Sequence, residues 1–285
     1  MLDSKTHAIV DELLPLIRSF TSCEYGIAVG GAHAKGVADS ESDLDIYLFT
    51  RGALKNSERE SLTVRYSSKI SDIVTWGNEE PFDQGGSDFY FDKTKIECWL
   101  RNSDNISNSV SECKEGIVKQ ELVRWTTTGF YNHCCLSDLK HMIPIEDPCE
   151  ILLKWQTDIR EYPPKLREAI IQKHLSGARF WPNNFHYKSA VERQDIVYTT
   201  GIIQQVIHNL IQVLFAVNRA YFPGDKKLEQ ALGKLDILPE RFIERMITLI
   251  FPAEKASVET LRAQQHNLQQ LLKDVEIIVY EALST

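Results

Sequence analysis

Apolar positions recur along this chain with two different periods, and the change of period divides it into two regions. In residues 43–50 polar and apolar side chains alternate, which is the pattern of a strand with one buried face. In residues 189–222 apolar side chains return every three or four positions, which predicts a long amphipathic helix. The first kind of pattern dominates up to about residue 105, and the second dominates after residue 112.

The first region is predicted to mix helices and strands. In chain order, the expected elements are a helix over 7–20, strands over 25–31 and 43–50, a helix followed by a strand within 57–76, and a hairpin over 89–101. Asp92 has the residue type and position of the turn in that hairpin. The most polar connector, residues 101–112, places a domain boundary near residue 110.

The second region is predicted to be entirely helical. Helical spacing is present in the segments 113–131, 149–162, 164–181, 189–222, 239–251 and 256–283. The sequence therefore predicts an α+β protein. A domain over residues 1–110 contains a mixed sheet with helices, and a domain over residues 111–285 resembles a helical bundle.

Composition and charge exclude several classes of protein. With 43% apolar and 25% charged residues, the chain has ordinary globular usage. A net charge of −8 disfavours a nucleic-acid-binding protein, because the phosphate backbone demands a basic surface. No run approaches 18 apolar residues and the N-terminus lacks a secretory pattern, so we expect a cytoplasmic protein without a membrane partner.

The six cysteines are expected to be reduced and mostly buried thiols. None belongs to a Cys-x-x-Cys pair or has zinc-ligand spacing. Cys134 and Cys135, next to His133, form a metal-like cluster that lacks further ligands, so a structural role is favoured.

The candidate chemistry is concentrated between residues 29 and 46. Gly30 and Gly31 end an apolar strand, where their backbone N–H groups can approach an anion closely. Asp43 and Asp45 are two residues apart on the next expected strand, so their side chains share a face. Two converging carboxylates repel each other unless a cation lies between them, and Mg²⁺ commonly bridges carboxylates to substrate phosphates. The combination predicts a metal–triphosphate site.

This motif resembles that of the DNA polymerase beta-like nucleotidyltransferase superfamily, in which a glycine pair and a short helix precede an Asp-apolar-Asp-apolar strand. The layout is similar to its small-molecule branch, the aminoglycoside and lincosamide nucleotidyltransferases, which join a minimal catalytic domain to a helical one. The resemblance implies that Asp43 and Asp45 hold metal and that the Gly30–Gly31 backbone, Lys35 and Ser42 bind the nucleotide. Gly31 stands where the family often has serine.

The resemblance also implies a third carboxylate on a later strand, for which Glu97 is the best candidate. A glutamate within an apolar strand is costly to bury unless it is paired or bound to metal. Glu97 would complete the metal site or accept a proton from the acceptor hydroxyl. The alternatives are Asp92, at the hairpin turn, and Asp83 and Asp88, which are assigned here to a glycine-rich loop.

The second region contributes weaker candidates. Asp195, at the start of the longest helical stretch, is expected either to cap that helix or to face a cationic acceptor across a cleft between the domains. Lys226 is expected either to be solvated or to reach the triphosphate.

The sequence therefore predicts a nucleotidyltransferase that uses Mg²⁺, with two ions expected, to move AMP from ATP to a hydroxyl of a small molecule. An aminoglycoside or lincosamide acceptor is implied by the resemblance alone. Two alternatives remain open: the same chemistry on a protein partner, and a non-catalytic nucleotide-binding module. The acceptor, the base preference and the oligomeric state do not follow from the sequence.

Overall fold

The computed structural model describes residues 2–39, 41–77, 83–123, 126–253 and 255–284. The chain forms two compact units, which we describe separately. The sheet unit comprises residues 1–112 and 131–161, and the helical unit comprises residues 113–130 and 162–285.

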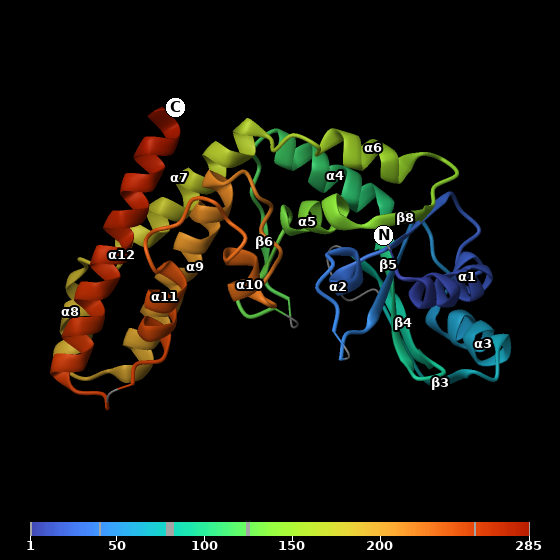
Figure 1. Ribbon diagram of the computed structural model, residues 1–285, viewed down its shortest axis with the longest axis horizontal. Helices are drawn as coiled ribbons and strands as arrows, with labels where there is room; N and C mark the ends of the chain where they lie inside the picture. Colours follow the sequence, from blue (N-terminus) through green and yellow to red (C-terminus); the bar gives the residue numbers. More distant parts are fainter. Residues whose placement is uncertain (1, 40, 78–82, 124–125, 254, 285) are drawn as a thin grey trace. The chain divides into compact units, whose positions relative to one another are not determined.

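A six-stranded mixed sheet forms the centre of the sheet unit (Figure 1). In spatial order its strands are β3 (Ile70–Trp76), β4 (Asp83–Phe91), β5 (Thr94–Asn102), β2 (Leu44–Thr50), β1 (Tyr25–Val29) and β8 (Ile143–Glu146). β2 and β5 pair in parallel, and the other neighbours pair antiparallel. The predicted α+β fold is confirmed, as is the hairpin, whose strands β4 and β5 flank Asp92.

One face of this sheet packs against helices to form the core of the unit. The helices of the sheet unit are α1 (Ser4–Arg18), α2 (Gly31–Ala34), α3 (Asn56–Tyr66), α4 (Ser103–Lys114), α5 (Cys134–His141) and α6 (Ile151–Asp158), of which α4 extends two residues past the unit's boundary. Leu44, Ile46 and Leu48 of β2 are at most 1% exposed and join apolar residues of α1 in this core. Because side chains alternate along a strand, burying these three residues turns Asp45 to the opposite face.

The division between the units differs from the predicted boundary at residue 110. The first break, after Glu112, lies close to it, but residues 131–161 return to the sheet unit and supply β8 and two helices. The polar segment expected to be a connector forms α4 instead. Hydrogen bonding of β8 to β1 explains the return, because edge pairing joins segments that are distant in sequence.

In the described part of residues 113–131, the predicted helix does not continue past Lys114. α4 ends at Lys114, and Gly116, with φ of +78°, adopts the left-handed conformation that terminates helices. The remainder contains two short strands, β6 (Gln120–Glu121) and β7 (Phe130–Tyr131), and Gly129 is also left-handed. The left-handed glycines therefore prevent a continuous helix here, although the apolar spacing of the segment is helical.

The helical unit is built around α9 (Ile196–Val217). The surrounding helices are α7 (Pro164–Phe180), α8 (Phe185–Glu192), α10 (Leu228–Leu232), α11 (Phe242–Ile250) and α12 (Val258–Ser284). The stretch predicted as one helix over 189–222 is interrupted at Gln194, whose φ is +54°. By length and composition α9 could cross a membrane, but 67% of its most apolar window is buried inside the protein, as in the core helix of a soluble domain.

Candidate active site

Three carboxylates meet on the face of the sheet opposite the core. Asp45 of β2 lies directly across from Glu97 of β5 in the parallel register, and Asp43 precedes Asp45 by two residues. One oxygen from each of these three side chains lies within 4.8 Å of the others. All three side chains are half-buried. The structure thus brings together the three residues that the sequence singled out for metal binding.

The electrostatics of this carboxylate cluster favour a bound cation. Burial, together with the charges of Asp43 and Glu97, raises the pKa of Asp45 to about 7. Burial also acts to raise the pKa of Asp43, but hydrogen bonding to Glu97 and the charge of Lys95 outweigh it and lower that pKa. Carboxylate oxygens are the ligands that Mg²⁺ prefers, and a divalent ion would offset this crowded negative charge. The residues present therefore fit a divalent metal ion.

Lys95 is a counter-ion that the sequence analysis did not identify. Its Nζ lies 3.4 Å from Oδ2 of Asp43 and also contacts Oε1 of Glu97. The bond to Glu97 raises the pKa of Lys95 to about 12. Since Lys95 is two residues before Glu97 on the same strand, the alternation of β5 alone could have suggested this pairing.

The Gly30–Gly31 turn packs directly against the cluster. A Cβ at Gly30 would lie 2.0 Å from the ring of Tyr47, and a Cβ at Gly31 would lie 1.6 Å from Oδ2 of Asp45. Gly31 also has φ of +55°, and its N–H donates to the Tyr47 hydroxyl over 3.2 Å. The absence of serine at position 31 thus has a steric reason in this chain, because the Asp45 carboxylate occupies the space of a side chain.

Lys35 and Ser42, both predicted to bind nucleotide, are engaged by neighbouring side chains. Lys35 Nζ lies 3.2 Å from Oδ1 of Asp138, whose Oδ2 lies 3.2 Å from Nη1 of Arg101. The Ser42 hydroxyl donates to Asp39 over 2.9 Å. Asp138 and Arg101 had no sequence signal, because α5 and β5 bring them to Lys35 from distant parts of the chain. Roles of Lys35 and Ser42 toward a nucleotide stay predictions.

A fourth carboxylate, Asp88, extends the acidic row to a third strand. It lies across from Glu97 in the register of β4 and β5, and its Oδ2 accepts a hydrogen bond from Nε1 of Trp76 at 3.0 Å. Burial raises the pKa of Asp88 to about 6. The assignment of Asp88 to a loop was wrong, since the glycines beside it continue β4. Asp92 is exposed at the hairpin turn, and the side chain of Asp83 lies outside the described residues.

Asp195 and Lys226 belong to the helical unit. Asp195 caps α9, with its Oδ1 accepting from the N–H of Tyr198 at 3.3 Å. Lys226 is exposed next to Asp225, whose carboxylate is held by Thr127 and Thr128. The capping role of Asp195 is a structural fact. The roles of Asp195 toward an acceptor and of Lys226 toward phosphate stay predictions.

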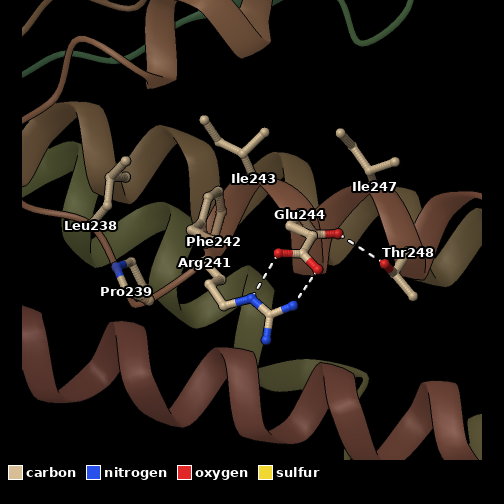
Figure 2. Close-up of a pocket in the computed structure, with 8 residues that line it drawn as sticks. All are labelled: Leu238, Pro239, Arg241, Phe242, Ile243, Glu244, Ile247 and Thr248. Carbon is tan, nitrogen blue, oxygen red and sulfur yellow. Dashed lines mark hydrogen bonds and ion pairs between the residues drawn. The ribbon is translucent and has the colours of Figure 1, made fainter.

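A hollow of about 550 Å³ lies along α11 of the helical unit (Figure 2). Its lining combines apolar side chains with the ion pair between Arg241 and Glu244. The two charges satisfy each other, and the Thr248 hydroxyl donates to the Glu244 carbonyl. This hollow brings together no set of metal-ligating side chains.

The cysteines agree with a structural role. Cys98, Cys113, Cys134 and Cys135 are buried, whereas Cys23 and Cys149 are exposed. The Sγ of Cys135 donates to the carbonyl of Asn132 over 2.8 Å. Within the described ranges, the grouping of metal-compatible side chains is the one formed by Asp43, Asp45 and Glu97.

Comparisons with known proteins add little to these observations. A family model described as a domain of unknown function, DUF4037, matches residues 137–228, about a third of the chain. No curated protein sequence matches the chain. The crystal structure of a nucleotidyltransferase-like protein from Exiguobacterium sibiricum 255-15 is similar over 98% of this chain and 78% of its own, with 9% identity and a TM-score of 0.45. At that TM-score the likeness carries no argument, so the function is argued from the site.

Proposed function

We propose that this protein is a metal-dependent nucleotidyltransferase. The observation that carries the proposal is the meeting of Asp43, Asp45 and Glu97 beside a glycine turn, on strands whose register places Asp45 opposite Glu97. The sequence motif resembles that of the DNA polymerase beta-like superfamily, and the packing of Gly31 against Asp45 supports the proposal. Asp43, Asp45 and Glu97 would hold the metal.

The side chains of the site have separable tasks in such a reaction. Bound Mg²⁺ would neutralise charge on the phosphates of a nucleoside triphosphate. The close packing of Gly31 on Asp45 holds the backbone of the turn beside the carboxylates, where it would lie next to the phosphate chain of a bound nucleotide. The half-buried Glu97 would either complete the metal site or accept the proton of the attacking hydroxyl. The reaction joins the acceptor oxygen to the α-phosphorus and releases pyrophosphate.

The nucleotide and the acceptor are the finer parts of the proposal. We infer ATP as the donor and a small hydroxyl compound as the acceptor, on the strength of the superfamily resemblance and of a helical unit following the catalytic one. An aminoglycoside or a lincosamide is the first acceptor to try. The net charge of −8 continues to disfavour a nucleic-acid acceptor.

The experiment that tests the proposal measures binding before it measures turnover. Purified protein is titrated with Mn²⁺, whose paramagnetism reports binding directly, alone and with a non-hydrolysable ATP analogue. Pyrophosphate release is then followed with ATP, Mg²⁺ and a panel of aminoglycosides, lincosamides and proteins. We expect metal and nucleotide binding to strengthen each other. Failure to bind either would refute the proposal, while binding without transfer to any acceptor would favour a non-catalytic nucleotide-binding module.

A further inference from the structure

Two tryptophans lie one row of side chains away from the carboxylate cluster. Trp99 follows Glu97 by two residues on β5, so both side chains are on the same face of the sheet. Gly86 of β4 pairs with Trp99 on one side and with Trp76 of β3 on the other. We call Trp76 and Trp99 together the indole ledge.

The indole ledge is held in place by contacts that leave both rings half-buried. The ring of Trp76 lies over Gly86, since a Cβ there would come within 2.5 Å of it, and its N–H is bound by Asp88. The rings of Trp76 and Trp99 meet edge to face, with centroids 4.8 Å apart and planes at 80°. The guanidinium carbon of Arg101 lies 5.9 Å from the centroid of the Trp99 ring. The exposed parts of these fixed rings offer a stacking surface with little conformational entropy to lose.

The spacing from the carboxylate cluster suits a nucleotide. Alternate residues of a strand are about 7 Å apart, so Trp99 is displaced by that length from Glu97. A ribose separates the α-phosphate of a nucleotide from its base by a similar length. On the side of Glu97 away from Trp99 along the strands, the next side chains on this face are Asp43 and Lys95. They are joined by an ion pair and offer no aromatic surface.

We propose that the indole ledge binds the nucleobase of the nucleoside triphosphate by stacking. The inference rests on the proposed function, because it places the α-phosphate at the carboxylate cluster. Stacking of a base on an aromatic side chain contributes about 1–3 kcal/mol and tolerates every base, since each has a π-face. The ledge therefore favours purines over pyrimidines by ring area, without sharp discrimination between the two purines.

The test compares ligands with and without a base. Wild-type protein and the variants Trp99→Leu and Trp99→Phe are titrated calorimetrically, in Mg²⁺, with α,β-methylene-ATP and with inorganic tripolyphosphate. We expect Trp99→Leu to weaken binding of the ATP analogue about 10-fold, which is about 1.4 kcal/mol, and to leave tripolyphosphate unchanged. Trp99→Phe should keep most of the affinity. Indole fluorescence should be quenched by the ATP analogue and not by tripolyphosphate.

A matched control is Trp181→Phe, which removes a half-buried indole of the helical unit that also stacks edge to face, on Tyr198. It should bind both ligands like the wild type. If Trp99→Leu weakens the binding of both ligands equally, the substitution has damaged the site as a whole, and the nucleobase proposal is overturned. Unchanged affinity for the ATP analogue with impaired transfer would assign the ledge to the acceptor and overturn the nucleobase proposal. If wild-type protein binds neither ligand, the proposed function itself is refuted.

Discussion

The two units of this protein differ in where their charged side chains lie. The sheet unit buries Arg59 and Arg101 and half-buries four carboxylates on neighbouring strands, Asp43, Asp45, Asp88 and Glu97. In the helical unit the core side chains of α9 are almost all apolar, and the ion pairs Arg241–Glu244 and Arg262–Glu192 are exposed. Burying charge is costly unless partners or ligands compensate it. The comparison therefore indicates that the sheet unit keeps charged side chains for function at a cost in stability. Four predictions test this difference between the two units.

The largest expected effect is on stability and contrasts two arginines. Arg59 is 1% exposed and donates hydrogen bonds to Leu54, Gly86 and Trp76 carbonyls. Arg59→Met should lower the free energy of unfolding by about 3 kcal/mol or more, because each buried acceptor left unpaired costs about 1–3 kcal/mol. Arg262→Met removes an exposed ion pair with Glu192 and should lower the free energy of unfolding far less, because solvent screens the pair. Urea denaturation of both variants measures the contrast, and equal losses would contradict it.

The second prediction contrasts two carboxylates in their effect on activity. Asp45→Asn should reduce turnover at least about 100-fold, since metal-mediated charge stabilisation supplies several kcal/mol of the rate enhancement. Glu192→Gln, in the helical unit, should leave turnover unchanged. Pyrophosphate release measures both once an acceptor is found, and circular dichroism verifies that the variants fold. Near-wild-type turnover of Asp45→Asn would remove Asp45 from the catalytic assignment.

The third prediction contrasts two glycines. Gly31→Ala places a Cβ in the space of the Asp45 carboxylate and at a positive φ, so it should destabilise the protein and weaken metal binding. Gly201 lies within α9 and is exposed, and a Cβ there meets nothing within 4 Å. Gly201→Ala should therefore stabilise the protein by about 0.5–1 kcal/mol. Thermal melting distinguishes the two, and the comparison fails if both glycine substitutions shift the melting temperature in the same direction.

The smallest expected effect separates the two roles of Asp195. Asp195→Ala removes the cap of α9 and should cost about 1 kcal/mol of stability. Asp195→Asn keeps a capping oxygen and removes the charge, so it should melt like the wild type. If Asp195 also faces a cationic acceptor, both variants should raise the KM for an aminoglycoside and spare ATP affinity. An unchanged KM in both would leave Asp195 as a cap alone.

The sequence predicted the local features of the site well. The alternation along residues 43–50 placed Asp43 and Asp45 on one face. The α+β fold and most helices of the second half also followed from periodicity. Residues 101–112 were taken for a connector because they are polar, and residues 113–131 were taken for a helix without the helix-ending effect of Gly116. The break of the long helix at Gln194 was missed, and at Asp88 two glycines were mistaken for a loop.

The features that the sequence by itself determined are those set within a few residues along the chain: the face on which a side chain points, the turn at Gly30–Gly31 and the caps of helices. The tertiary structure alone decided which strand lies beside which. Parallel pairing of β2 with β5 sets Asp45 opposite Glu97, 52 residues away, and α5 returns to the sheet to bring Asp138 to Lys35 and Arg101. Pairing across such distances depends on the packing of the whole sheet against its core, because no local period encodes the register between strands.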